Sequence, residues 1–167
     1  MIEDIEKRQH VVNEQSAARS PAGDAFAGLA ILVLRLAGHL TLAGDALAKP
    51  VRQTSARWQV LAAAGHGTMS VAQIARVLGV TRQAVQRLAD LIEADGLARY
   101  QDNPAHQRAK LLVLTDEGRQ VLAAIKASQA TWANALGAEL GETDLRAAGL
   151  VLDRVLGALT RGAAGDE

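Results

Sequence analysis

The chain has 167 residues, no net formal charge and no cysteine. The lack of cysteine excludes disulfide scaffolds, thiolate metal sites and cysteine redox sensors, and the length fits one domain or two small ones. Alanine and leucine fill most of the apolar positions, and both residues favour helices. The composition therefore predicts a mostly helical protein.

The first fifty residues are predicted to form a polar tail and one long helix. Residues 1–23 are mostly polar, and we expect a mobile tail with a short helix at residues 2–13. Asp24 is expected to cap a helix that ends near Pro50. The middle of this helix is apolar on all faces, which predicts burial on more than one side.

Neither secretion nor membrane insertion is expected from this region. The most apolar run, residues 25–37, is interrupted by Arg35 and is shorter than a bilayer-spanning helix. The first ten residues, "MIEDIEKRQH", are charged and lack the apolar segment of a secretion signal. We therefore expect a cytoplasmic protein without a membrane partner.

A helix-turn-helix unit is predicted in the middle of the chain. A short helix from Thr54 or Ser55 to Ala64 precedes it, and the "GHGT" turn that follows places His66 in a solvated loop. Ser70 then begins a capping box, Gly79 permits the tight turn, Thr81 caps the second helix and Gly96 ends it. The first helix is expected to bury Val71, Ile74, Ala75 and Leu78, and the second Val85, Leu88, Ala89 and Ile92.

A hairpin and two further helices are predicted to follow. "LARYQ" and "AKLLVLT" have the pattern of strands on either side of the loop "DNPAHQR", which gives a winged variant of the unit with a two-stranded wing. Thr115 is expected to cap a helix with two acidic residues in its first turn. Its apolar stripe should be Val121, Ile125, Trp132 and Leu136, with the small Ser128 filling the gap. A final helix is expected to begin near Thr143, and its apolar stripe should be Leu145, Leu152, Leu156 and Leu159.

The charge distribution points to an anionic partner. There is no acidic residue between Asp45 and Asp90, although that window carries six cations. The alternative is a solvated helix face in an ordinary bundle, but a basic segment in a neutral chain favours a localised anion. Arginine and glutamine can bind base edges in a major groove, serine and threonine hydroxyls suit phosphate, and an arginine in the hairpin loop suits a minor groove. The residues expected to contact double-stranded DNA are Ser70, Thr81, Arg82, Gln83, Gln86, Arg87, Arg108 and Lys110.

The order of elements and the segment "MSVAQIARVLGVTRQAVQRLADLIEADGLARYQDNPAHQRAKLLVLTDEG" resemble the MarR family of bacterial winged-helix regulators. The most specific part is "LIEADGLARY" followed by "RAKLLVLTDEG". The resemblance implies a homodimer, with a helical dimerisation region at residues 24–50 and 119–162 and a DNA-binding domain at residues 51–118. It also implies transcriptional control of an inverted-repeat operator, usually repression relieved by a small aromatic or anionic ligand.

The hairpin loop departs from the family pattern. Many members carry Asp-x-Arg-Asp where residues 103–106 of this chain are Asn-Pro-Ala-His. The missing Arg–Asp pair predicts a looser wing, in which His106 would take over a polar contact. Arg108 does match an arginine of the family, whereas the cysteine of peroxide-sensing members is absent.

Three residues are candidates for a ligand pocket, and each also has a purely structural interpretation. Arg35 and His39, one helical turn apart, would hold an anion, and Trp58 would line the pocket. The four histidines lack metal-ligand spacing, so we expect neither a metal nor a cofactor.

An enzyme is not expected, because the sequence has no nucleophile motif, P-loop or dinucleotide-binding motif. An enzyme with His39 or His66 as its base is the remaining catalytic interpretation. The main alternative to a regulator is a winged-helix module that binds a ligand or another protein without reading DNA sequence.

Overall fold

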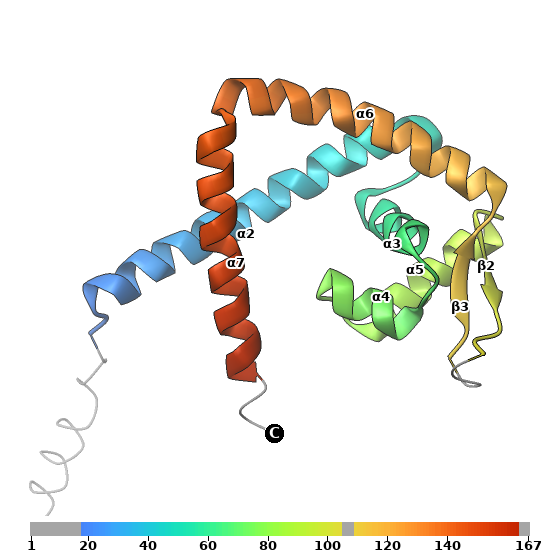
Figure 1. The fold of residues 1–167 in the computed structure, drawn as a ribbon, viewed down its shortest axis with the longest axis horizontal. Coiled ribbons are helices and arrows are strands. Elements are labelled where there is room, and N and C mark those ends of the chain that lie inside the picture. Colours follow the sequence, from blue (N-terminus) through green and yellow to red (C-terminus); the bar gives the residue numbers. More distant parts are fainter. Residues whose placement is uncertain (1–17, 105–108, 164–167) are drawn as a thin grey trace, which may run out of the picture. The chain divides into compact units, whose positions relative to one another are not determined.

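The computed structural model describes residues 18–104 and 109–163, so the predicted helix at residues 2–13 and the loop residues His106 and Arg108 lie outside it. The chain forms two compact units, Met1–Leu42 and Ala43–Glu167. Within the described ranges the fold is mostly helical, with one small antiparallel sheet (Figure 1). The predicted fold class is confirmed at this level.

Helix α2 (Pro21–Ala48) begins earlier than predicted. The N–H of Gly23 donates to the Ser20 hydroxyl at 3.1 Å, so Ser20 is the capping residue. Pro21 occupies the first helical position, where its missing N–H costs nothing. Asp24 lies inside the first turn and pairs with Arg19 at 3.9 Å. The predicted cap at Asp24 was therefore wrong.

The expected burial of α2 does not occur within the single chain. Only Gly44 and Ala48 are buried, while Leu34 is 74% exposed. The segment Pro21–Val51 is the one helical stretch among the described residues that is long and apolar enough to cross a membrane. The uninterrupted apolar run at residues 25–37 is only part of this helical stretch. Length and composition do not distinguish lipid from another protein surface as the environment of such a helix.

Helix α3 (Ser55–His66) follows a short 3-10 turn, η1 (Lys49–Val51). The Thr54 hydroxyl accepts from the N–H of Arg57 at 3.3 Å and caps the helix. The Asp45 carboxylate accepts from the N–H of Ser55 at 2.6 Å, which fixes the end of α2 against the start of α3. His66 is exposed, as predicted, but it is the last residue of α3 and not a loop residue, with Nδ1 2.7 Å from the carbonyl oxygen of Ala62.

Helices α4 (Val71–Leu78) and α5 (Arg82–Ala94) form the predicted helix-turn-helix. The capping box of Ser70 and Gln73 is complete, because each residue's side chain bonds the other's backbone N–H. Gly79 has a φ of 66°, a left-handed conformation that glycine adopts without steric cost. The Thr81 hydroxyl accepts from the N–H of Ala84 at 3.2 Å and caps α5.

The wing is part of a three-stranded sheet with the order β1-β3-β2. Strands β2 (Ala98–Gln101) and β3 (Leu111–Leu114) form the predicted hairpin. Strand β1 (Met69–Ser70) pairs with the other edge of β3 and was not predicted. Two residues are too few to show the alternation by which a strand is identified from sequence.

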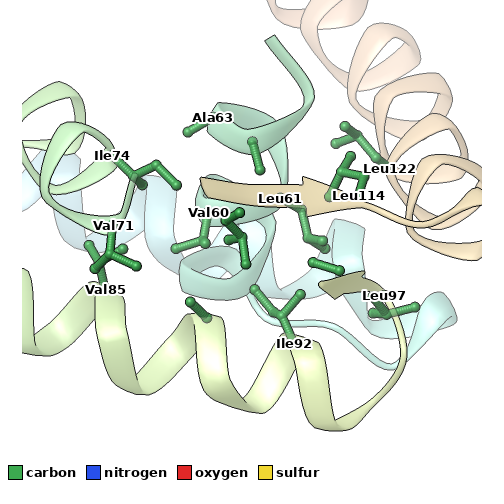
Figure 2. Close-up of a cluster of buried hydrophobic side chains, with 14 of the residues drawn as sticks. Val60, Leu61, Ala63, Val71, Ile74, Val85, Ile92, Leu97, Leu114 and Leu122 are labelled. Carbon is green, nitrogen blue, oxygen red and sulfur yellow. The ribbon is translucent and has the colours of Figure 1, made fainter. Parts of the chain in front are cut away.

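The core of the second unit joins α3, α4, α5 and the sheet (Figure 2). Its fully buried side chains come from four different elements. In Figure 2 the side chains of α3 point between α4, α5 and strand β3. The largest fully buried residues in this cluster are Val60, Leu61, Ile74, Val85, Ile92 and Leu112.

Helices α6 (Asp116–Leu140) and α7 (Glu142–Ala163) complete the chain (Figure 1). The Thr115 hydroxyl accepts from the N–H of Gly118 at 3.1 Å, as predicted for a cap. Only the start of α6 joins the core, through Leu122 and Ile125. The predicted apolar stripe of α7 is exposed in the single chain, with Leu156 at 62%.

The start of α6 depends on a close backbone approach at Gly118. A Cβ there would overlap the Leu97 carbonyl oxygen and lie 2.8 Å from its carbon. We expect Gly118→Ala to lower the free energy of unfolding by about 1–3 kcal/mol or more, because backbone atoms have little room to move. Gly67→Ala is the control, since nothing lies within 4 Å of a Cβ there and its φ of 168° is accessible to alanine. Urea denaturation measures both. Equal stability of the two variants would contradict this packing.

Candidate nucleic-acid interface

Helix α5 presents the polar face that the sequence predicted. Val85, Ala89 and Ile92 are fully buried and lie on one side of the helix, as their spacing requires. Of the predicted DNA-contacting residues of this helix, Gln83 and Arg87 lie on the other side and are exposed, and Gln86 is half-buried. Arg82 is exposed because it is the first residue of the helix, one turn before Val85.

One cation of the acid-free window is held inside the fold. The Arg57 side chain is 16% exposed and forms an ion pair with Asp95. This pair joins α3 to the end of α5, so Arg57 is not available to an external anion. The exposed positive charge of α4 and α5 comes instead from Arg76, Arg82 and Arg87.

A groove of about 310 Å³ lies where the start of α4, helix α5 and the wing strands meet. Four of the predicted DNA-contacting residues line it, which is a juxtaposition that sequence spacing did not show. Two of the four, Arg82 and Lys110, are cationic and come from α5 and from the residue just before β3. The lining residues are Ser70, Val71, Ala72, Arg82, Gln86, Tyr100, Ala109 and Lys110.

The two predicted hydroxyl contacts differ in what they can offer a phosphate. Ser70 is buried, and its hydroxyl donates to Gln73 Oε1 at 3.0 Å within the capping box. Thr81 is exposed and accepts from the N–H of Ala84, which leaves its hydroxyl hydrogen to donate outward. Of the two, Thr81 is better placed for a phosphate, and a contact by Ser70 would have to compete with the capping box.

A hydrogen-bond network that was not predicted joins α5 to β2. The Gln86 amide nitrogen donates to Asp90 Oδ1 and to the Tyr100 hydroxyl oxygen, each at 2.7 Å. The Tyr100 hydroxyl in turn donates to Asp90 Oδ1 at 2.7 Å. The N–H of Tyr100 donates to Glu93 Oε1 at 3.0 Å. Side chain and backbone of Tyr100 thus both bind α5.

The network changes the acidity of the tyrosine. Burial, together with the hydrogen bond to Asp90 and the charge of its carboxylate, raises the pKa of the Tyr100 hydroxyl well above its ordinary value. Deprotonation would place a second negative charge beside Asp90 and would remove the donor that holds the carboxylate. Tyr100 therefore remains a hydrogen-bond donor throughout the neutral range.

Comparison with known proteins identifies the fold and the family. The MarR family model matches residues 54–109. The uncharacterized protein Rv2011c of Mycobacterium tuberculosis is 46% identical over 102 residues, which cover 61% of this chain and 71% of that protein. The chain belongs to the MarR family. The resemblance inferred from the sequence is confirmed, and so is the winged helix-turn-helix fold.

Two solved structures of the transcriptional repressor CouR have the same MarR fold. One, bound to a 23-mer DNA duplex, has a TM-score of 0.67 and 26% identity and covers 84% of this chain and 99% of its own. The other, bound to p-coumaroyl-CoA, has a TM-score of 0.68 and 26% identity and covers 77% of this chain and 91% of its own.

The remaining predicted residues of this MarR-family chain come from two different helices, α2 and α3. Arg35 and His39 are exposed on α2, and Trp58 is half-buried against the core of the second unit. Their role as a ligand pocket stays a prediction. Among the described residues no group of three or more His, Asp or Glu side chains is arranged to hold a metal ion.

The single tyrosine allows a direct spectroscopic test of the network. At pH 10, where an ordinary phenol is about half ionised, we expect little tyrosinate absorbance while circular dichroism still shows the folded helices. Because the folded-state pKa is the higher one, the network stabilises the fold below about pH 10 and loses this contribution as the pH rises further. Asp90→Asn should lower the midpoint. A midpoint near the ordinary value in the folded parent would contradict the network.

Proposed function

We propose that this chain is a homodimeric transcriptional regulator that binds an inverted-repeat operator and represses transcription in a ligand-responsive way. The observation that carries the proposal is that Arg82, Gln83 and Arg87 are exposed on α5, a helix whose other residues Val85, Ala89 and Ile92 anchor it in the core. An arginine can bind guanine bidentately in a major groove, and a glutamine can bind adenine. The CouR complex with a DNA duplex supports the same use of this fold.

The groove beside α5 supports a backbone contact next to the base contacts. Arg82 and Lys110 line one groove of about 310 Å³, and Thr81 at the start of α5 has a hydroxyl hydrogen to donate. Phosphates are bound by such cations, hydroxyls and helix N-termini, and these contacts set the position of the protein on the duplex. We therefore assign phosphate contacts to Lys110 and Thr81, beside the base-reading Arg82, and expect Arg108 to contact the DNA from the same side.

Exposed apolar helices support the dimer. Leu34 on α2 and Leu150 and Leu156 on α7 are each more than 60% exposed in the single chain. Monomers rarely leave apolar patches of this kind uncovered. A second copy would cover them and place two α5 helices in successive major grooves, with half-sites about one helical turn apart.

A small effector and a cytoplasmic location complete the proposal. CouR is solved with p-coumaroyl-CoA, an aromatic and anionic ligand, which supports an effector of that chemical kind here.

No catalytic motif accompanies the binding face, so we infer a binding protein and not an enzyme. The departure of the wing at residues 103–106 from the family pattern favours one alternative, a winged-helix module that does not read DNA sequence.

The base-reading role of α5 predicts a sequence-dependent loss of affinity. On an operator obtained by selection from random duplexes, Arg82→Ala and Arg87→Ala should each cost about 1–3 kcal/mol, with much smaller losses on non-specific DNA. Lys126→Ala, which removes an exposed cation of α6, should change neither. Fluorescence anisotropy at near-physiological salt measures all four proteins. Unchanged operator affinity in both arginine variants would contradict the assignment.

Salt dependence separates the regulator from the interaction module. Phosphate contacts release counterions, so operator affinity should fall steeply between about 50 and 200 mM salt. A parent chain that selects no sequence, and is retained on DNA only at low salt, would contradict the regulator and favour the module.

The dimer predicts that a charge in the exposed apolar surface will separate the subunits. Sedimentation equilibrium of the parent should give twice the chain mass of 17.5 kDa. Leu34→Glu and Leu150→Glu should shift the equilibrium to the monomer, because a buried unpaired carboxylate is costly. Val77→Glu is the control, since Val77 is 65% exposed at the end of α4, outside the predicted dimerisation region. A monomeric parent would contradict the proposal.

A further inference from the structure

Both acidic residues of helix α5 are bound by a single residue of the wing. Asp90 accepts from the Tyr100 hydroxyl at 2.7 Å, and Glu93 accepts from the Tyr100 N–H at 3.0 Å. These are the acidic residues that α5 contains. Tyr100 therefore fixes where the negative charge of the helix lies, and it joins the wing to the helix that carries the exposed arginines.

Asp90 sets the orientation of the Gln86 amide, and Tyr100 takes up the second N–H of the same nitrogen. A carboxylate can only accept hydrogen bonds, so the amide end that faces Asp90 must be the nitrogen. The Tyr100 hydroxyl hydrogen is used on Asp90, so its oxygen is left to accept from the same nitrogen. Turning the amide over would bring its oxygen against the Asp90 carboxylate, where both groups can only accept. The oxygen of Gln86 is therefore the end that is turned away from this network.

We propose that Tyr100 is a positioning residue for base recognition: its hydroxyl accepts the Gln86 N–H that Asp90 does not hold, so that only the Gln86 oxygen is left to select the base. This inference rests on the proposed operator binding. A free glutamine binds adenine bidentately, donating to N7 and accepting from N6. A glutamine that offers only its oxygen accepts from an amino group, and adenine N6 and cytosine N4 both present one in the major groove. Adenine and cytosine should then be bound about equally well.

The experiment compares base preferences in the full-length protein. Gln86→Ala first identifies the operator position at which base preference disappears. Duplexes carrying each of the four bases at that position are then bound to the parent and to Tyr100→Phe, which keeps the buried ring and removes only the hydroxyl. We expect the parent to bind adenine and cytosine duplexes within about two-fold. In Tyr100→Phe one Gln86 N–H stays on Asp90 and the other is free to donate to adenine N7, so this variant should favour adenine by about five-fold or more, the lower end of a bidentate contact.

Preferences at the operator positions bound by Arg82 should be the same in the parent and in Tyr100→Phe. Affinity for non-specific duplexes should also be unchanged, since no cation is removed. Both controls distinguish a positioning residue from one that only supports the fold, because a misplaced wing would weaken binding to every sequence.

Three results would overturn the inference while leaving the regulator proposal intact. The first is an adenine-to-cytosine ratio that is the same in Tyr100→Phe and in the parent. The second is a loss of affinity in Tyr100→Phe that is uniform over all duplexes. The third is a Gln86→Ala variant with unchanged preference at every position. If the parent itself selects no sequence, the regulator proposal fails before any variant is compared, so the two failures are distinguishable.

Discussion

The rest of the structure depends on the burial of one face of α5. Val85, Ala89 and Ile92 are fully buried against α3, α4 and the sheet, and burial of a valine or isoleucine side chain contributes about 1.5–3 kcal/mol. Once these residues are fixed, the periodicity of the helix fixes the direction of the others. Arg87 is exposed because Val85 and Ala89 are buried on the opposite side, whereas Arg82 is exposed because it begins the helix. The same burial brings Gln86 and Asp90 to the wing, where Tyr100 binds them.

Features that depend on neighbouring residues could be predicted from the sequence. The caps at Ser70, Thr81 and Thr115 and the left-handed turn at Gly79 are local arrangements, and each is present. The Asp24 cap was wrong because Ser20, followed by a proline at the first helical position, is the better start signal.

Features that depend on contacts between distant segments could not be predicted. Strand β1 exists only because Met69 and Ser70 meet β3, more than forty residues later. The Tyr100 network joins residues 10 and 14 positions apart on a helix and a strand, and no spacing rule covers such a pair. Likewise, nothing in the basic window shows that Arg57 is bound to Asp95 while Arg82 is exposed.

The neutral net charge and the basic face are compatible because of where the acids are held. Asp95 neutralises Arg57 at the end of α5, and Asp90 and Glu93 are both bonded to Tyr100. The charged residues that line the groove between α4, α5 and the wing are Arg82 and Lys110, while Asp90 is bonded to two of its polar lining residues, Gln86 and Tyr100. Local field, and not net charge, governs attraction of a charged partner at the scale of a Debye length, about 10 Å. A chain without net charge can thus attract a polyanion at one surface.

The apolar helices and the basic face would support one another in the proposed assembly. A single recognition helix contacts only a few base pairs, and each good contact contributes about 1–3 kcal/mol of discrimination. Two helices related by a two-fold axis double that discrimination only if their separation is fixed. In the dimer proposed here, coverage of exposed leucines such as Leu34 and Leu156 would supply the rigidity that sets this separation. The apolar surface that is unfavourable in a single chain would then be what makes its basic face selective.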